Sequence, residues 1–204
     1  YGMVELSFGV MDMVFAGFDP DSFSLLVQRG SFDQLLLRPV DITLQVFSSA
    51  IVMRRGGRIL QGAAVLIYGM TAIHITWTFT KAFFMPIILI SLVAYFGGLF
   101  IAGSTITFWT VERIEAVNML TYGGTEMMSY PMSIYPTWLQ RFFTFVLPAI
   151  FLNYYPAIYL MDKPDPFGLL AWEPLLTPLA GFLVLGAALV FWRFGVSHYQ
   201  STGS

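Results

Sequence analysis

Long apolar runs, interrupted by short polar segments, are the dominant pattern along this chain. Residues 59–80 contain no Asp, Glu, Lys or Arg, and residues 82–111 also lack these four residue types. A helix that rises about 1.5 Å per residue needs roughly 20 apolar residues to cross a hydrocarbon core about 30 Å thick. The pattern therefore predicts membrane-spanning helices over 59–80 and 83–108.

The residues before and after these two predicted spans add further apolar runs. Residues 1–18 are apolar enough to form the end of a span, although they include Glu5 and Asp12. Towards the other end of the chain, residues 173–192 form a further apolar run that predicts one more span.

Composition agrees with this pattern. The chain is 57% hydrophobic and only 11% charged, whereas a soluble domain carries roughly 25% charged residues. We therefore expect an all-α, polytopic membrane protein. The chain has no Cys, which excludes disulfides and cysteine-held metal clusters, and no metal site is expected.

The positive charges predict the orientation in the membrane. Residues 19–58 contain five arginines, whereas the loop after the next span contains only Lys81. Because cytoplasmic loops carry an excess of Lys and Arg, the segment 19–58 is predicted to be cytoplasmic. Counting the spans onward places the tail 193–204 on the same side. The five arginines are Arg29, Arg38, Arg54, Arg55 and Arg58.

The segment 19–58 also has a helical pattern of its own. Phe32, Leu35 and Leu36 stand at positions i, i+3 and i+4, so one face of a short helix is apolar. Gly30 interrupts the pattern before this helix and Pro39 ends it. Periodicity alone leaves two interpretations: the helix lies in the membrane interface, or its apolar face fits a groove on a partner.

The region 109–160 allows two topologies. In the first, residues 109–140 stay cytoplasmic and 142–161 cross the membrane; the polar residues around Glu126 favour this on hydropathy. In the second, residues 112–130 cross as a short polar span and 135–160 form a re-entrant hairpin on the outer side. Four prolines favour the second, because they break the apolar stretch more than a simple span tolerates: Pro131, Pro136, Pro148 and Pro156.

Four separated stretches resemble one known family. They are RGSFDQLLLRPV, TITFWT, YPMSIYPTWLQRFFTFVLPAIFLNYYPA and FWRFGVSHYQSTGS. In this order they resemble the permease subunit of ABC-2 type ABC transporters, within a bacterial branch described only as ABC transport permeases. The resemblance covers essentially the whole chain and implies a type V exporter-like transmembrane domain. The complete subunit would have six spans, about five of them represented here, with a basic tail and the first span preceding Tyr1.

The resemblance implies that the loop around Gly30 to Pro39 is a coupling helix, which docks into a separate ATPase. Phe32, Leu35 and Leu36 would supply an apolar knob, while charged neighbours would pair with the rim of the ATPase and set the register. The expected coupling residues are Arg29, Phe32, Asp33, Leu35, Leu36, Arg38 and Pro39.

The expected partners follow from what the chain lacks. It contains no G-x-x-x-x-G-K-[ST] sequence, the P-loop that cradles nucleotide phosphates. We therefore expect no enzymatic activity and no cofactor in this chain, with ATP and Mg²⁺ bound by the partner ATPase subunits. The resemblance implies two further partners: a second permease chain, identical or related, and the lipid of the bacterial cytoplasmic (inner) membrane. No nucleic-acid partner is expected.

The resemblance also favours the second topology for 109–160 and suggests export by alternating access in a permease dimer. Polar residues of the first span and of the short polar span are the candidates for lining the pathway. They are Glu5, Asp12, Asn118, Thr121, Thr125 and Glu126. The alternative function is that of a non-transporting membrane anchor or structural subunit of a larger assembly.

Overall fold

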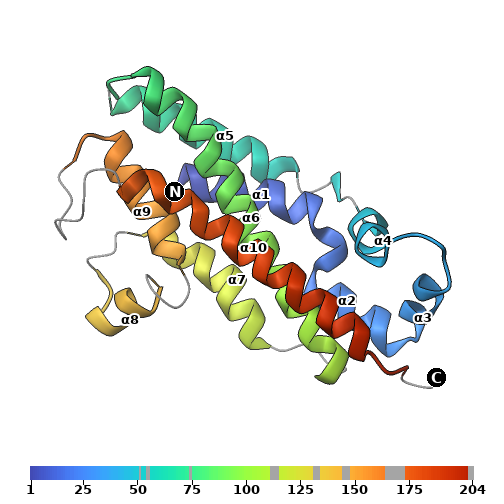
Figure 1. The fold of residues 1–204 in the computed structure, drawn as a ribbon. Coiled ribbons are helices and arrows are strands. Elements are labelled where there is room, and N and C mark those ends of the chain that lie inside the picture. The colour runs from blue at the N-terminus through green and yellow to red at the C-terminus, as the bar shows by residue number, and fades with distance from the viewer. Residues whose placement is uncertain are drawn as a thin grey trace.

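The computed structural model describes residues 1–50, 52–53, 56–73, 75–110, 115–130, 134–143, 148–163 and 173–201. Arg54, Arg55 and Pro131, used in the sequence analysis, lie outside these residues. Within the described ranges the chain forms helices and no strand (Figure 1). The helices are α1 (Gly2–Val14), the 3-10 helix η1 (Ala16–Phe18), α2 (Pro20–Gln28), α3 (Ser31–Leu36), α4 (Ile42–Ser49), α5 (Gly56–Ala72), α6 (Phe79–Thr110), α7 (Glu115–Met128), α8 (Thr137–Arg141), α9 (Ala149–Leu160) and α10 (Glu173–His198).

Two long apolar helices, α6 and α10, form the centre of the bundle. Among the described residues, Phe79–Thr110 and Leu175–His198 are long and apolar enough to cross a membrane. The two helices run parallel and side by side (Figure 1). Near one end Ser91 Oγ donates a hydrogen bond to the Pro178 carbonyl over 2.5 Å, and near the other Gly195 packs against Thr105.

A second pair, α1 and α5, runs antiparallel. A Cβ atom on Gly2 would lie 2.7 Å from Leu66 Cα, and one on Gly9 would lie 3.1 Å from the Ile59 nitrogen. Glycine therefore lets the two backbones approach closely, as small residues commonly do between membrane helices. The outer surfaces of α5 and α10 carry many exposed apolar side chains.

Several helix boundaries differ from those expected. The uncharged run over 59–80 predicts one span, but α5 ends at Ala72 and α6 begins at Phe79, where the Thr78 hydroxyl accepts a hydrogen bond from the Lys81 N–H. Hydropathy cannot place this break because both sides of it are apolar. At the other end α10 continues to His198, beyond the expected end of the span at 192.

The short polar helix α7 packs one face against the bundle, where Thr121 and Thr125 are buried, and leaves Met119 and Glu126 exposed on the other. Asn118 donates to Asp21 at the α2 end, over 3.3 Å, and the Tyr122 ring lies 5.3 Å from the Phe8 ring in the middle of α1. The helix α9 has 12 residues and is therefore about 18 Å long, too short to cross a bilayer alone. The two topologies of 109–160 both stay predictions.

The end of the bundle opposite α2–α4 is tied by a buried lysine. Lys81 Nζ donates to Asp162 Oδ2 over 2.6 Å and to the Leu160 carbonyl over 3.2 Å. These bonds hold the end of α9 against the beginning of α6. They also hold the pKa of the Asp162 carboxyl below its ordinary value, because Lys81 donates to the charged form and Thr76 adds a second hydrogen bond.

Candidate functional site

The described residues between α1 and α5 form the 3-10 helix η1 and three short α-helices, which begin at clear local signals. The side chain of Asp19 accepts a hydrogen bond from the Asp21 N–H and Pro20 stands in the first turn of α2, which together are a common helix start. Gly30 has a φ of 65° between α2 and α3, a conformation that glycine adopts most readily. Asp41 caps α4 by accepting from the Leu44 N–H over 3.1 Å.

Six aromatic rings fix this segment to the rest of the bundle. The Phe32 ring lies 4.9 Å from the Tyr199 ring and 5.0 Å from the Phe108 ring. The Phe23 ring lies 5.5 Å from the Trp192 ring. Most of these pairs meet edge to face, which is a favourable geometry for aromatic rings. We call this set the aromatic cluster: Phe18, Phe23, Phe32, Phe108, Trp192 and Tyr199.

The position of Phe32 corrects the expected docking surface. The family resemblance implies that Phe32, Leu35 and Leu36 supply an apolar knob to the ATPase, but Phe32 is 0% exposed. That expectation is wrong for Phe32, because its ring is enclosed by the aromatic cluster. Leu35 is half-buried against the same core.

The exposed apolar side chains of this segment run from the last residue of α3 into the first turn of α4. Leu36 is 44% exposed, Leu37 85%, Val40 56% and Leu44 63%. Gln45 holds the connection between α3 and α4 in place, because its Nε2 donates to the carbonyls of Leu35 and Val40. We call the four exposed side chains the 36–44 surface. The sequence signal for it was the apolar run that continues through Leu37 and resumes after Pro39.

The acids and the arginines around the 36–44 surface differ in whether they have partners within the chain. Asp41 caps α4, and the hydrogen bond from the Leu44 N–H lowers the pKa of its carboxyl. Asp33 accepts a hydrogen bond from Ser201 Oγ over 2.6 Å. Arg29 and Arg38 are exposed, and no ion pair joins either of them to another residue that the structure describes. The acids of this segment therefore have partners within the chain, while the two arginines face outward.

Glu5, one of the expected pathway residues, is bound by an arginine. Arg58 Nε donates to Glu5 Oε2 over 2.7 Å and Nη2 donates to Oε1 over 3.1 Å. The Arg58 guanidinium also lies 4.4 Å from the centre of the Phe8 ring, within the range of a cation–π contact. Glu5 is 5% exposed. The pair joins α1 to α5 across 53 residues of sequence.

The side chains of the other expected pathway residues differ in how exposed they are. Thr121 and Thr125 are 0% exposed, and the Thr125 hydroxyl donates to the Thr121 carbonyl one turn earlier. They face the packed interior of this chain and not an open surface. Asp12 is also buried, and Asn118 is half-buried beside Asp21. Of the six, Glu126 is the one whose side chain is exposed.

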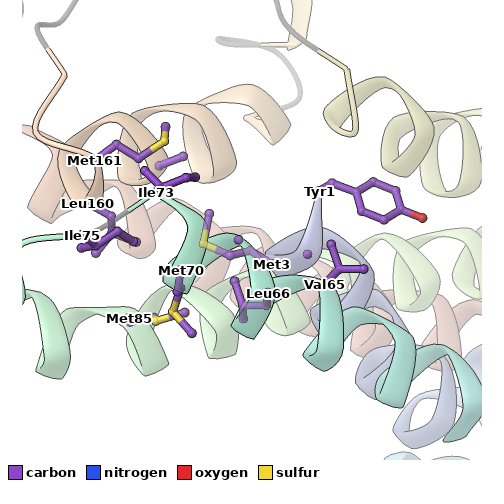
Figure 2. A pocket seen from close by; sticks show the side chains of 13 residues that line it. Tyr1, Met3, Val65, Leu66, Met70, Ile73, Ile75, Met85, Leu160 and Met161 are labelled. Atoms are coloured by element: carbon purple, nitrogen blue, oxygen red, sulfur yellow. The ribbon is translucent and has the colours of Figure 1, made fainter.

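A cavity of about 270 Å³ lies near Tyr1, at the end of the bundle opposite α2–α4. Its labelled side chains carry only carbon and sulfur apart from the Tyr1 hydroxyl (Figure 2). Four of them are methionines: Met3, Met70, Met85 and Met161. Such a lining offers apolar contact but no acid, base or nucleophile. Among the described residues there is also no group of His, Cys, Asp and Glu that could hold a metal ion.

The fold and these surfaces define a class of protein. The described residues form a helical bundle in which two helices are long and apolar enough to cross a membrane, with a packed segment of short helices at one end. The chain belongs to the ABC-2 family of transporter proteins, because the model of that family matches residues 1–203. No curated protein and no solved structure matches the chain.

Proposed function

We propose that this chain is the permease subunit of an ATP-binding cassette exporter and that it docks separate ATPase subunits through its 36–44 surface. Membership of the ABC-2 family supports a membrane component of a transporter. In this proposal α1, α5, α6, α7 and α10 cross the bacterial cytoplasmic membrane, and α8 and α9 form the re-entrant hairpin. The segment α2–α4 and the C-terminus lie in the cytoplasm, and ATP and Mg²⁺ bind to the partner.

The observation that carries the proposal is the exposure of the 36–44 surface on a rigid support. Leu37 and Leu44 are more than 60% exposed, although Phe32 in the same segment is completely enclosed. Burying such side chains in a partner gains roughly 25 cal/mol per Å² of apolar surface. Anchoring by the aromatic cluster also means that little order has to be gained on binding, so less of that free energy is lost.

The charges indicate what kind of groove would receive this surface. Asp33 and Asp41 are occupied by hydrogen bonds within the chain, whereas Arg29 and Arg38 project outward. A groove with an apolar floor and carboxylates on its rim would complement them. Rim pairs of this kind mainly set the register and the association rate. In this arrangement Asp33 positions the permease's own tail and does not contact the ATPase.

The substrate pathway would lie between two permease subunits, on the side where Glu126 is exposed. A charged side chain on a membrane helix almost always faces protein or water, since lipid solvates it poorly. The Glu5–Arg58 pair lies on the neighbouring helices α1 and α5. Alternating access would then change which side of the membrane reaches Glu126. Export is the proposed direction because most members of the family export.

Co-purification of the ATPase tests this proposal. The permease is expressed with a candidate ABC ATPase, extracted in mild detergent, and compared with a variant that carries Leu37→Asp and Leu44→Asp. Both positions are exposed, so the variant is expected to fold and to lose the ATPase. Leu25→Asp is the matched control, because Leu25 is 47% exposed on α2 and lies outside the 36–44 surface; it should retain the ATPase.

Each result has a clear meaning. If the double variant keeps the ATPase as well as the native protein does, the 36–44 surface is not the docking site. If the native permease itself binds no ATPase, the chain is better explained as a membrane anchor or structural subunit.

A further inference from the structure

A stack of three aromatic rings lies on the outer surface where α6 and α10 end. The Trp109 ring lies 5.7 Å from the Phe191 ring, with the two planes 15° apart, and 6.1 Å from the Phe194 ring, with the planes 28° apart. Trp109 is 48% exposed and Phe194 is 52% exposed, so this stack is distinct from the enclosed aromatic cluster. It lies at the end of the bundle that carries α2 and α3 (Figure 1).

An exposed apolar stripe leads from this stack along α10. Leu179, Leu183 and Val190 are exposed, and with Phe194 they follow one another at spacings of four, seven and four residues. Such spacings place them on one face of the helix. From Leu183 to Phe194 the stripe is about 16 Å long at 1.5 Å per residue, roughly half of a hydrocarbon core about 30 Å thick. The stripe is therefore as long as one leaflet is thick.

The last turns of α10 surround the Phe194 ring with polar side chains. Arg193, Ser197 and His198 are all exposed. His198 Nδ1 lies 2.9 Å from the Phe194 carbonyl oxygen, and because a carbonyl can only accept, this nitrogen donates. The His198 ring also lies 4.1 Å from the Phe194 ring. His198 Nε2 has no hydrogen bond to another residue that the structure describes, so it is left to face a ligand.

Arg193 forms no ion pair with a described acid. The bases in the ion pairs of the described ranges are Arg58 and Lys81. The charge of Arg193 does act on Asp41, whose carboxyl has a lowered pKa chiefly because of the hydrogen bond from the Leu44 N–H, with a smaller contribution from Arg193. The guanidinium is therefore available to an anion, and its bonds to a phosphate would be strong because both partners are charged.

An anionic phospholipid satisfies both parts of this surface. Its phosphate would accept hydrogen bonds from the Arg193 guanidinium and from His198 Nε2. A protonated imidazole donates from both nitrogens, and the C-terminal end of a helix stabilises positive charge. Its acyl chain would cover the ring stack and the stripe beyond it. Aromatic rings are also typical of the depth at which headgroups meet hydrocarbon.

We propose that the outer face of the last turns of α10, together with Trp109, binds an anionic phospholipid from the adjoining leaflet. Arg193 and His198 select the negative headgroup, and the Trp109, Phe191 and Phe194 rings hold the beginning of an acyl chain. This site goes beyond the proposed function, since it requires α6 and α10 to cross the membrane but does not require an ATPase.

Quenching of tryptophan emission by brominated lipids tests this inference. The permease is reconstituted in vesicles of phosphatidylcholine and phosphatidylglycerol, in which one lipid at a time carries bromine on its acyl chains. Because the chain has five tryptophans, the Trp109 signal is taken as the difference between each protein and the same protein with Trp109→Phe. Half-maximal quenching should need about fivefold less phosphatidylglycerol than phosphatidylcholine, the factor that one basic residue near an anionic membrane surface supplies.

Two double variants separate a site from a general attraction of positive charge to anionic lipid. Arg193→Gln with His198→Gln should remove the preference for phosphatidylglycerol. The matched control is Arg29→Gln with Arg38→Gln, which removes two exposed positive charges from the same end of the bundle and should keep the preference. All four side chains are exposed, so both variants are expected to fold.

Three results would overturn the inference. Equal quenching of the native protein by the two lipids would mean that ordinary boundary lipid covers this face, and this comparison needs no variant at the charged positions. Loss of the preference in both double variants would mean that only the overall charge attracts the lipid. Absence of Trp109 quenching by either lipid would mean that protein, such as a second permease chain, covers the face instead.

Discussion

Truncating Phe32 should destabilise the protein strongly, although this residue stands in the segment that the sequence marks as a docking surface. Phe32→Ala removes a ring that is 0% exposed and that lies within 6.3 Å of four other rings. Replacing a buried Phe by Ala typically costs about 3–5 kcal/mol, because apolar contact is lost and a cavity remains. The exposed residue Leu37 gives the contrast: Leu37→Ala should change stability by less than about 0.5 kcal/mol.

Thermal unfolding in detergent, followed by tryptophan fluorescence, measures this difference. Trp192, one of five tryptophans in the chain, lies in the same cluster as Phe32, so part of the emission reports loss of the packing. With roughly 2–4 °C per kcal/mol for a domain of this size, Phe32→Ala should lower the midpoint by about 10 °C. Leu37→Ala should stay within about 2 °C of the native protein. Equal midpoints for the two variants would refute the placement of Phe32 in the core.

Two further predictions concern the other end of the bundle and the α1–α5 contact. The hydrogen bond from Lys81 lowers the pKa of Asp162 in the folded state. The contribution of this bond to stability is therefore complete above about pH 4, the ordinary Asp pKa, and is lost as the pH falls through the lower folded pKa. Asp162→Asn should be less stable than the native protein at neutral pH and equal to it in strong acid, and a constant difference across this range would contradict the bond. Gly62→Ala should lower the unfolding midpoint, because a Cβ there would collide with the Leu6 backbone, at a cost of about 1–3 kcal/mol for overpacking. Gly69→Ala on the same helix meets open space and should not lower it, so equal losses at the two positions would argue against the close approach of α1 and α5.

Hydropathy was sufficient to predict the class of fold and its two longest helices. The uncharged run of 82–111 contains nearly all of α6, because a helix surrounded by protein and lipid needs apolar residues on every face. The break between α5 and α6 was not predictable in the same way. Its residues are uncharged on both sides, and the Thr78 cap has a weak sequence signal.

The candidate site shows where a pattern along the chain stops being informative. The spacing of Phe32, Leu35 and Leu36 correctly indicates that they share a helix face, but it does not say what that face meets. Two of the rings that enclose Phe32, those of Phe108 and Trp192, come from α6 and α10, more than 70 residues away. Arg58 likewise binds Glu5 across 53 residues. Contacts of this kind depend on tertiary packing, which no local window contains.

A structure of the permease in complex with its ATPase, determined in a lipid nanodisc, tests the central claim most directly. We predict that Leu36, Leu37, Val40 and Leu44 are buried in a groove of the ATPase, with Arg29 and Arg38 facing carboxylates on its rim and Phe32 still enclosed within the permease. An ATPase seated elsewhere, with the 36–44 surface against lipid or solvent, would contradict the account.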